Sequence, residues 1–90
     1  MNKCFLGFTF GETRGHVYHI ATYTERAAIT ACAMDIKQDE VATIVEMPTS
    51  LDDLYRNLWP RHCMDAHELM DWAMTTGKVV KTFSHWKTHR

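Results

Sequence analysis

A stretch rich in small residues, from Thr24 to Lys37, is the feature that most constrains the fold of this chain. Its apolar residues recur at the i, i+3, i+4 and i+7 spacing of one helical face. Thr24 can cap the first turn, because its hydroxyl can accept a hydrogen bond from an amide that has no partner within the helix. Small side chains let a helix lie close to a flat neighbour, so we expect this helix to pack on a β-sheet. The expected buried stripe is Ile29, Cys32, Ala33 and Ile36.

Four other stretches have the β-branched and aromatic composition that is typical of strands. The first alternates regularly between two faces, whereas the second alternates poorly and is expected to be covered on both faces or to lie centrally in the sheet. Gly11 and Gly15 bracket the loop between these two and predict a β-hairpin. The expected strands are residues 4–10, 16–23, 41–47 and 78–83.

Two further helices are expected in the second half of the chain. Ser50 can cap the first of them, which carries a stripe of leucines and ends before Pro60. Asp65 and Glu68 form a second capping signature, and Gly77 supplies the C-terminal end of that helix. The expected ranges are 50–58 and 65–76.

The resulting order, β-β-α-β-α-α-β, predicts a single α+β domain over residues 1–90. A helical crossover between the second and third strands makes these two parallel, with the first strand between them. We therefore expect a four-stranded, mainly antiparallel sheet in the order 2-1-3-4. One helix should pack on one face, and the two later helices should form a C-terminal helical hairpin against an edge or beside the first helix.

Composition indicates a folded protein without a membrane segment, since 46% of the residues are hydrophobic and 23% are charged. No apolar run approaches the roughly 20 residues of a bilayer-spanning helix, and the first residues lack the pattern of a secretory signal. We expect a cytoplasmic location, which for a phage-encoded protein means the host cytoplasm. The three cysteines, Cys4, Cys32 and Cys63, are odd in number and far apart in the sequence, so we expect reduced thiols and not a disulfide framework.

Charge is unevenly distributed along the chain although the net charge is only −1. Residues 35–77 contain nine acidic and three basic side chains, a local net charge of −6. Residues 78–90 contain four basic side chains and no acidic one. An acidic middle and a basic end indicate two surfaces that would attract different partners.

The densest group of reactive side chains is Cys63, His67 and Asp71, spaced four residues apart. A thiol near a helix N-terminus and a histidine could act as a nucleophile. The capping signature starts the helix at Asp65, however, which takes Cys63 off the helical face and adds a charge that opposes thiolate formation. We therefore favour a structural cysteine and a surface His67–Asp71 pair over a Cys63/His67 thiol enzyme.

A metal site is a weaker alternative for the same region. Cys63 and His67, together with His85 and His89, have spacings compatible with a four-ligand zinc site. The second pair falls at a strand end or in the tail, and ligand spacing alone is an unspecific signal. We expect neither a metal nor another cofactor.

The C-terminal stretch interleaves positive and aromatic side chains. Lys81, Lys87 and Arg90 could hold phosphates while Trp86 stacks on a base, which would make the protein a small nucleic-acid binder. The alternative is a solvated edge strand whose lysines discourage pairing between sheet edges. In the helix 65–76, Met70 and Trp72 add more apolar surface than one sheet contact requires, so packing within the domain competes with a docking surface.

The favoured hypothesis is a small non-enzymatic interaction protein that docks on a larger protein or protein–nucleic-acid complex and blocks it. Proteins of this size and composition are common among phage and mobile-element accessory proteins, including inhibitors of host defence such as anti-CRISPR proteins. The nucleic-acid binder and the thiol enzyme are the alternatives. The candidate partner-binding residues are Asp52, Asp53, Arg56, Arg61, Met70, Trp72, Lys78, Lys81, His85, Trp86, Lys87 and Arg90.

Overall fold

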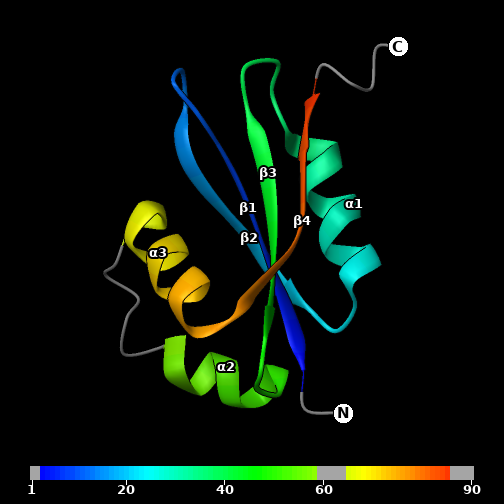
Figure 1. Ribbon diagram of the computed structural model, residues 1–90, viewed down its shortest axis with the longest axis vertical. Helices are drawn as coiled ribbons and strands as arrows, with labels where there is room; N and C mark the ends of the chain where they lie inside the picture. Colours follow the sequence, from blue (N-terminus) through cyan, green and yellow to red (C-terminus); the bar gives the residue numbers. More distant parts are fainter. Residues whose placement is uncertain (1–2, 59–64, 86–90) are drawn as a thin grey trace.

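The structure, a computed structural model, describes residues 3–58 and 65–85, apart from the side chains of residues 20–22, 55, 57 and 58. The elements follow the order β-β-α-β-α-α-β, so the expected α+β fold class is confirmed (Figure 1). Their bounds are β1 Cys4–Gly11, β2 Gly15–Thr22, α1 Glu25–Asp35, β3 Val41–Met47, α2 Leu51–Leu58, α3 Ala66–Thr76 and β4 Lys78–Ser84.

The four strands form one sheet in the order β2-β1-β3-β4, and every neighbouring pair is antiparallel. The order 2-1-3-4 is therefore confirmed. The poor alternation of β2 has its cause in coverage, because α1 contacts this strand and so does α3. The other explanation, a central position for β2, is wrong, since β2 lies at the edge of the sheet.

Helices cover both faces of the sheet, with α1 on one and α3 on the other (Figure 1). The core is accordingly divided into two clusters. One contains Leu6 and Phe8 of β1 with Leu54 of α2 and Leu69 of α3, and the other contains Ile44 of β3 with residues of α1. The expectation that α3 would lie at an edge or beside α1 is wrong. Alternate residues of β1 and β3 are apolar on both sides, so each face needs its own cover.

The stripe by which α1 packs is largely the expected one, since Cys32 and Ile36 are buried and Ile29 packs against the same cluster. The difference is that Ala28 takes the place of Ala33. Cys32 is fully buried and Ala28 is 1% exposed, whereas Ala33 lies on the exposed side. The buried row follows i, i+4, because Cys32 lies over Gly7, where the sheet surface carries no side chain. A Cβ atom added to Gly7 would lie 2.6 Å from the Cys32 sulfur. Gly7 therefore sets how closely α1 approaches the sheet.

The helix caps are those that the sequence predicts. The side chains of Thr24, Ser50 and Asp65 accept hydrogen bonds from backbone amides three residues later, at 3.1, 3.1 and 2.8 Å. The amide of Gly77 closes α3 by donating to the carbonyl of Ala73 at 2.7 Å. In the hairpin, Gly15 has a φ of 82°, a conformation that favours glycine.

The helices contain 11, 8 and 11 residues, and within the described ranges none has the length and apolarity required to cross a membrane. The helix α2 lies beyond the end of the sheet that also holds the N-terminal side of β1 (Figure 1). Its Leu51 and Leu54 reach the same core cluster as α3.

Candidate functional site

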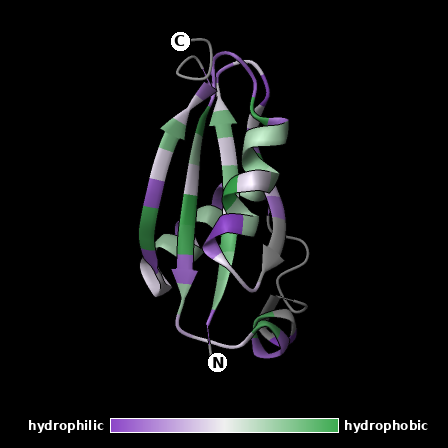
Figure 2. Ribbon diagram, turned by 90° about the vertical axis from the view of Figure 1, so that its right-hand side faces the viewer, coloured by the Kyte–Doolittle hydropathy of each residue, from purple (hydrophilic) through white to green (hydrophobic). Residues whose placement is uncertain are grey.

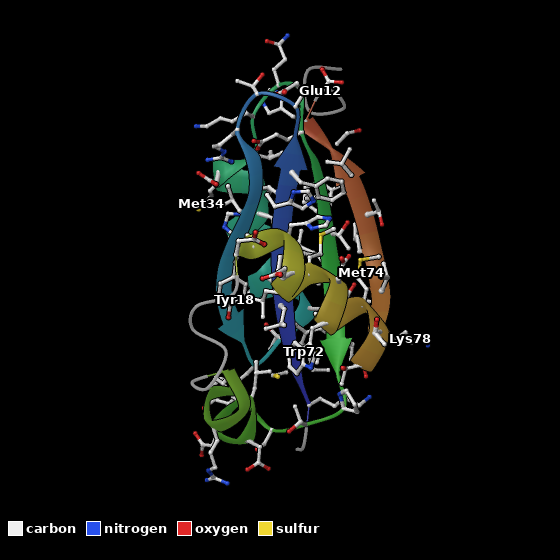
Figure 3. The ribbon with its side chains drawn as sticks, turned by 90° about the vertical axis from the view of Figure 1, so that its left-hand side faces the viewer. Glu12, Tyr18, Met34, Trp72, Met74 and Lys78 are labelled. Atoms are coloured by element: carbon white, nitrogen blue, oxygen red, sulfur yellow. The ribbon has the colours of Figure 1, made fainter. Side chains whose placement is uncertain are left out.

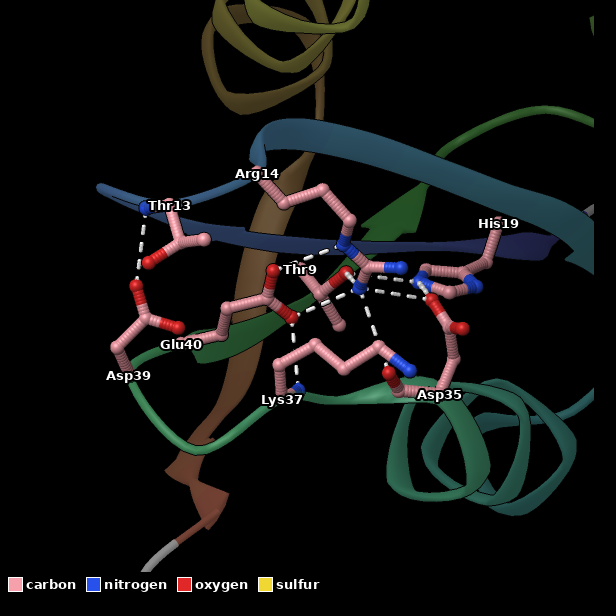
Figure 4. Close-up of polar contacts among 8 residues, drawn as sticks. All are labelled: Thr9, Thr13, Arg14, His19, Asp35, Lys37, Asp39 and Glu40. Carbon is pink, nitrogen blue, oxygen red and sulfur yellow. Dashed lines mark hydrogen bonds and ion pairs between the residues drawn. The ribbon is translucent and has the colours of Figure 1, made fainter.

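A charged cluster joins the β1–β2 hairpin to the segment between α1 and β3 (Figure 4). Arg14, at the hairpin turn, donates from Nε to Glu40 Oε2 at 2.9 Å and from Nη2 to Glu40 Oε1 at 2.8 Å. The Glu40 side chain is fully buried, while that of Arg14 is 31% exposed. A two-pronged pair of this geometry fixes both side chains, since the planar guanidinium matches the two carboxylate oxygens.

Two more carboxylates extend this cluster. Arg14 Nη2 also donates to Asp35 Oδ2 at 2.9 Å, and the amide of Thr13 donates to Asp39 Oδ2 at 3.0 Å. The amide of Lys37 donates to Glu40 Oε1 at 2.8 Å, which links the carboxylate to the start of its own loop. The hairpin turn is thereby tied at several points to the α1–β3 connection.

The inner end of the cluster contains Thr9 and His19. Arg14 Nη2 lies 3.3 Å from Thr9 Oγ1, which is 3.0 Å from His19 Nε2. Because the guanidinium can only donate, the Thr9 hydroxyl accepts from Arg14 and can donate to His19. That arrangement requires an unprotonated Nε2, and burial in turn lowers the pKa of His19 below its usual 6.5. Asp35 Oδ2, 3.6 Å from His19 Nε2, acts in the opposite direction, but burial is the larger effect on this pKa.

The acidic members are held ionised. The hydrogen bonds from Arg14 lower the pKa values of Glu40 and Asp35, and the same two carboxylates raise the pKa of Arg14. No buried nitrogen or oxygen atom of a described side chain lacks a hydrogen-bond partner. The cluster is therefore satisfied from within, and its geometry serves to join segments of the fold.

Sequence reasoning missed this cluster completely. The one residue that could have indicated the cluster is Glu40. It comes immediately before a buried strand, and a buried carboxylate needs a charged partner. Arg14 is the basic residue of the hairpin turn and the natural candidate. Nothing in the spacing of 26 residues between them indicates the contact, which depends on β1 lying between β2 and β3.

The described thiols are poor nucleophiles. Cys4 and Cys32 are fully buried, and burial raises their pKa values to about 11 and about 12. Cys63 lies outside the described residues, so the thiol-enzyme hypothesis is not tested. Its partner His67 is exposed on α3, where its ring meets the His16 ring at 4.5 Å and its Nε2 lies 3.9 Å from Asp71 Oδ2.

The four residues considered as zinc ligands are not brought together by the part of the chain that can be described. His67 lies on α3 and His85 follows β4, while Cys63 and His89 fall outside that part. Among residues 3–58 and 65–85, no group of three or more potential metal-ligating side chains is placed to hold an ion.

The candidate partner-binding residues lie on several elements of the structure. Lys78 and Lys81 are exposed on β4, and Asp52, Asp53 and Arg56 are exposed on α2. Arg56 Nη1 donates to Asp53 Oδ1 at 2.8 Å. His85 is partly buried, and Arg61, Trp86, Lys87 and Arg90 lie outside the described residues.

The aromatic and thioether candidates on α3 lie close to the core. Met70 is only 7% exposed and belongs to the core cluster under α3, as the alternative of packing within the domain predicted. Trp72 is partly buried against the same cluster. Both residues are buried or partly buried because α3 packs its apolar side on a face of the sheet. The exposed apolar residue of this helix is instead Met74, at 44%.

The outer edge of the sheet at β4 presents different chemistry on its two sides. Lys78 and Lys81 pair with Glu46 and Ile44, and these residues of β3 face α1. Val79 is 39% exposed and pairs with Val45, which faces α3. Directly paired residues lie on the same face, so the exposed lysines lie on the side where Val80 and Phe83 pack against the core, and exposed Val79 lies on the other side. Met74 of α3 adds exposed apolar surface on the side of Val79 (Figure 3).

An open hollow of about 290 Å³ lies at the start of β4. It is lined by Lys3, Glu46 and Lys78, together with Pro48, Thr76 and Gly77. Lys3 Nζ contacts Glu46 Oε2 at 2.9 Å. The two lysines and one carboxylate leave this end of the edge with a positive charge.

Three comparisons were made with known proteins, and no protein-family model, curated protein or solved structure matches this chain.

Proposed function

We propose that this protein is a small non-enzymatic interaction protein that docks on a larger protein or protein–nucleic-acid complex and blocks it. Phages and mobile elements encode inhibitors of this kind against host defence, of which anti-CRISPR proteins are one class. The single observation that carries the proposal is the exposed β4 edge, with Lys78 and Lys81 on one side and Val79 and Met74 on the other.

The chemistry of the described interior agrees with docking rather than catalysis. The buried thiols have raised pKa values, and the Arg14–Glu40 cluster uses its charges to join segments of the fold. A catalytic group must reach a substrate, whereas the thiols are buried and the charged groups of the cluster bind one another. By contrast, a charged and apolar surface is what a protein contact requires. The assignment to anti-defence inhibitors rests on the small size and composition that such proteins share.

Affinity purification from bacterial lysate tests this proposal. The tagged wild-type protein should retain one partner or complex in stoichiometric amount, and added protein should inhibit that partner's activity in proportion. The double variant K78E/K81E should lose the partner, since it reverses the charge of the β4 edge. The variant R26E/K37E is the matched control, because it reverses two exposed positive charges in α1 and in the α1–β3 connection and leaves β4 unchanged.

The alternatives predict different results. A nucleic-acid binder would retain RNA or DNA without a protein partner, and that binding would fall steeply with salt concentration. Failure to retain any stoichiometric partner, or a partner whose activity is unaffected at saturation, would contradict the proposed function.

A further inference from the structure

The β4 edge has one unpaired side. Figure 2 shows β4 at the border of the sheet, and no helix or strand of residues 3–58 or 65–85 lies beyond it. In an antiparallel pair, alternate residues direct their N–H and C=O groups away from the neighbouring strand, so half of the backbone groups of β4 face outward. Such an edge can accept a further strand.

A second copy of this chain is a poor occupant of the edge. The antiparallel register that pairs all of Lys78–Ser84 with itself places Lys81 opposite Lys81. Like charges directly opposite one another destabilise a strand pair. Among the described residues, neither Lys78 nor Lys81 forms an ion pair that would neutralise it. The lysines therefore oppose self-association, and an acidic strand would remove the same repulsion.

The edge also specifies the alternation of an incoming strand. Lys78 and Lys81 project on the face that α1 covers, where Val80 and Phe83 pack against the core, whereas exposed Val79 projects on the face that α3 covers. Successive side chains of a strand point to opposite faces. A complementary strand therefore carries acidic residues opposite Lys78 and Lys81 on one face and apolar residues toward Val79 on the other.

A bulge in β4 limits where pairing is regular. Lys81 pairs with Ile44 and Val79 with Val45, so Val80 is an extra residue. Edge bulges hinder unspecific pairing because they interrupt the ladder. The extra residue also brings Lys78 and Lys81, which are three residues apart, onto the same face of β4, where both can meet acidic residues of an incoming strand.

We infer that the β4 edge binds an extended segment of a partner protein as an added strand in which acidic and apolar residues alternate. This inference rests on the proposed function, for which it supplies the contact and the chemistry of the partner. A protein segment is favoured over nucleic acid as the ligand, because a phosphate backbone cannot provide the alternating N–H and C=O groups of a strand.

A synthetic peptide provides the direct test. The probe alternates glutamate and valine over about eight residues, a usual strand length. Its affinity is measured by fluorescence anisotropy, and its site by protection of β4 amides from hydrogen exchange. We expect binding in the micromolar range, with K81E weakening it by about tenfold and a lysine–valine peptide restoring binding to K81E. K37E, which changes an exposed lysine on another surface, should bind the probe as the wild type does.

Two comparisons separate strand addition from plain charge attraction. Methylating alternate backbone amides of the peptide keeps its charge but removes its hydrogen bonds to the edge, and should abolish binding. Equal binding of the methylated peptide, or tighter binding of a single-stranded oligonucleotide, would overturn the inference. So would the absence of binding at about 1 mM peptide. If the wild-type protein still retains its stoichiometric partner in those cases, the inference fails while the proposed function stands.

Discussion

Glu40 is the most demanding single residue of the fold, because its carboxylate is fully buried and ionised. In the variant Glu40→Gln, Arg14 keeps Asp35 but loses its buried partner. We expect the free energy of unfolding in urea to fall by about 2–4 kcal/mol, as when one member of a buried ion pair is removed. Asp53→Asn is the control, since the exposed Asp53–Arg56 pair should contribute less than about 1 kcal/mol. Equal stability of the two variants would contradict this account of the cluster.

His19 makes stability depend on pH above the range of the carboxylates. Burial lowers its pKa in the folded protein, so the unfolded state binds more protons once the pH falls below 6.5. Stability should therefore decrease from that point downward. Asp35 and Glu40 have lowered pKa values too, so their contribution is present above their usual values of 3.8 and 4.5 and is lost at lower pH.

The contribution of His19 is the difference in the free energy of unfolding between the wild type and His19→Gln, measured in urea from neutral pH to about pH 5. We expect the wild type to be more stable at neutral pH, because Thr9 and His19 form a partly buried hydrogen bond. The difference should shrink as the pH falls, since only the wild type must bury a titrating imidazole. A difference that stays constant over this interval would show that His19 does not titrate during unfolding.

At the scale of elements, the sequence predicted those features of a helix or strand that depend on residues only a few positions apart. Thr24, Ser50 and Asp65 each cap the helix that follows, because a cap is a contact between residues three apart. The strand Val41–Met47 and its closing Pro48 were predictable for the same reason. The close approach of α1 to the sheet was not predictable, since it depends on Gly7, a residue of a different element.

The contact between Gly7 and Cys32 can be tested by a double-mutant cycle. Gly7→Ala places a methyl group 2.6 Å from the Cys32 sulfur and should destabilise the protein by about 1–3 kcal/mol. Cys32→Ala frees this space, so the double variant should be more stable than the sum of the two single changes predicts, by about 1 kcal/mol. The measurement is urea unfolding of all four proteins.

Gly15→Ala supplies the matched control for this cycle. A Cβ at Gly15 meets nothing within 4 Å, and its cost of about 1 kcal/mol comes from the positive φ alone. Cys32→Ala should therefore not alter the effect of Gly15→Ala. Rescue of both glycine variants by Cys32→Ala would contradict a specific contact between β1 and α1.

At the scale of the whole molecule, the sequence predicted the order of the strands but not the side on which the later helices lie. Connection lengths and crossover direction fix the order. The later helices pack on the face of the sheet that α1 leaves uncovered. That face can be identified only when the face that α1 covers is known. The same dependence explains why Met70 is buried and why the Arg14–Glu40 cluster could not be found in advance.

The division of the core raises the question of whether its two halves unfold together. Cys4 lies in the cluster under α3 and Cys32 in the cluster under α1, so each thiol reports one half. Both have raised pKa values and no exposed surface, and each should react only after opening. β1 and β3 contribute residues to both clusters, which favours a single cooperative unit.

Thiol labelling in a Cys63→Ser background tests this cooperativity. We expect Cys4 and Cys32 to react at the same rate in native conditions, at least about a thousandfold more slowly than in concentrated urea. The rates are read by mass spectrometry of the labelled peptides at several urea concentrations. Faster labelling of Cys32 alone, with little dependence on urea, would mean that α1 opens separately from the sheet. In that case the stability changes predicted for Gly7→Ala would report the docking of α1 and not global unfolding.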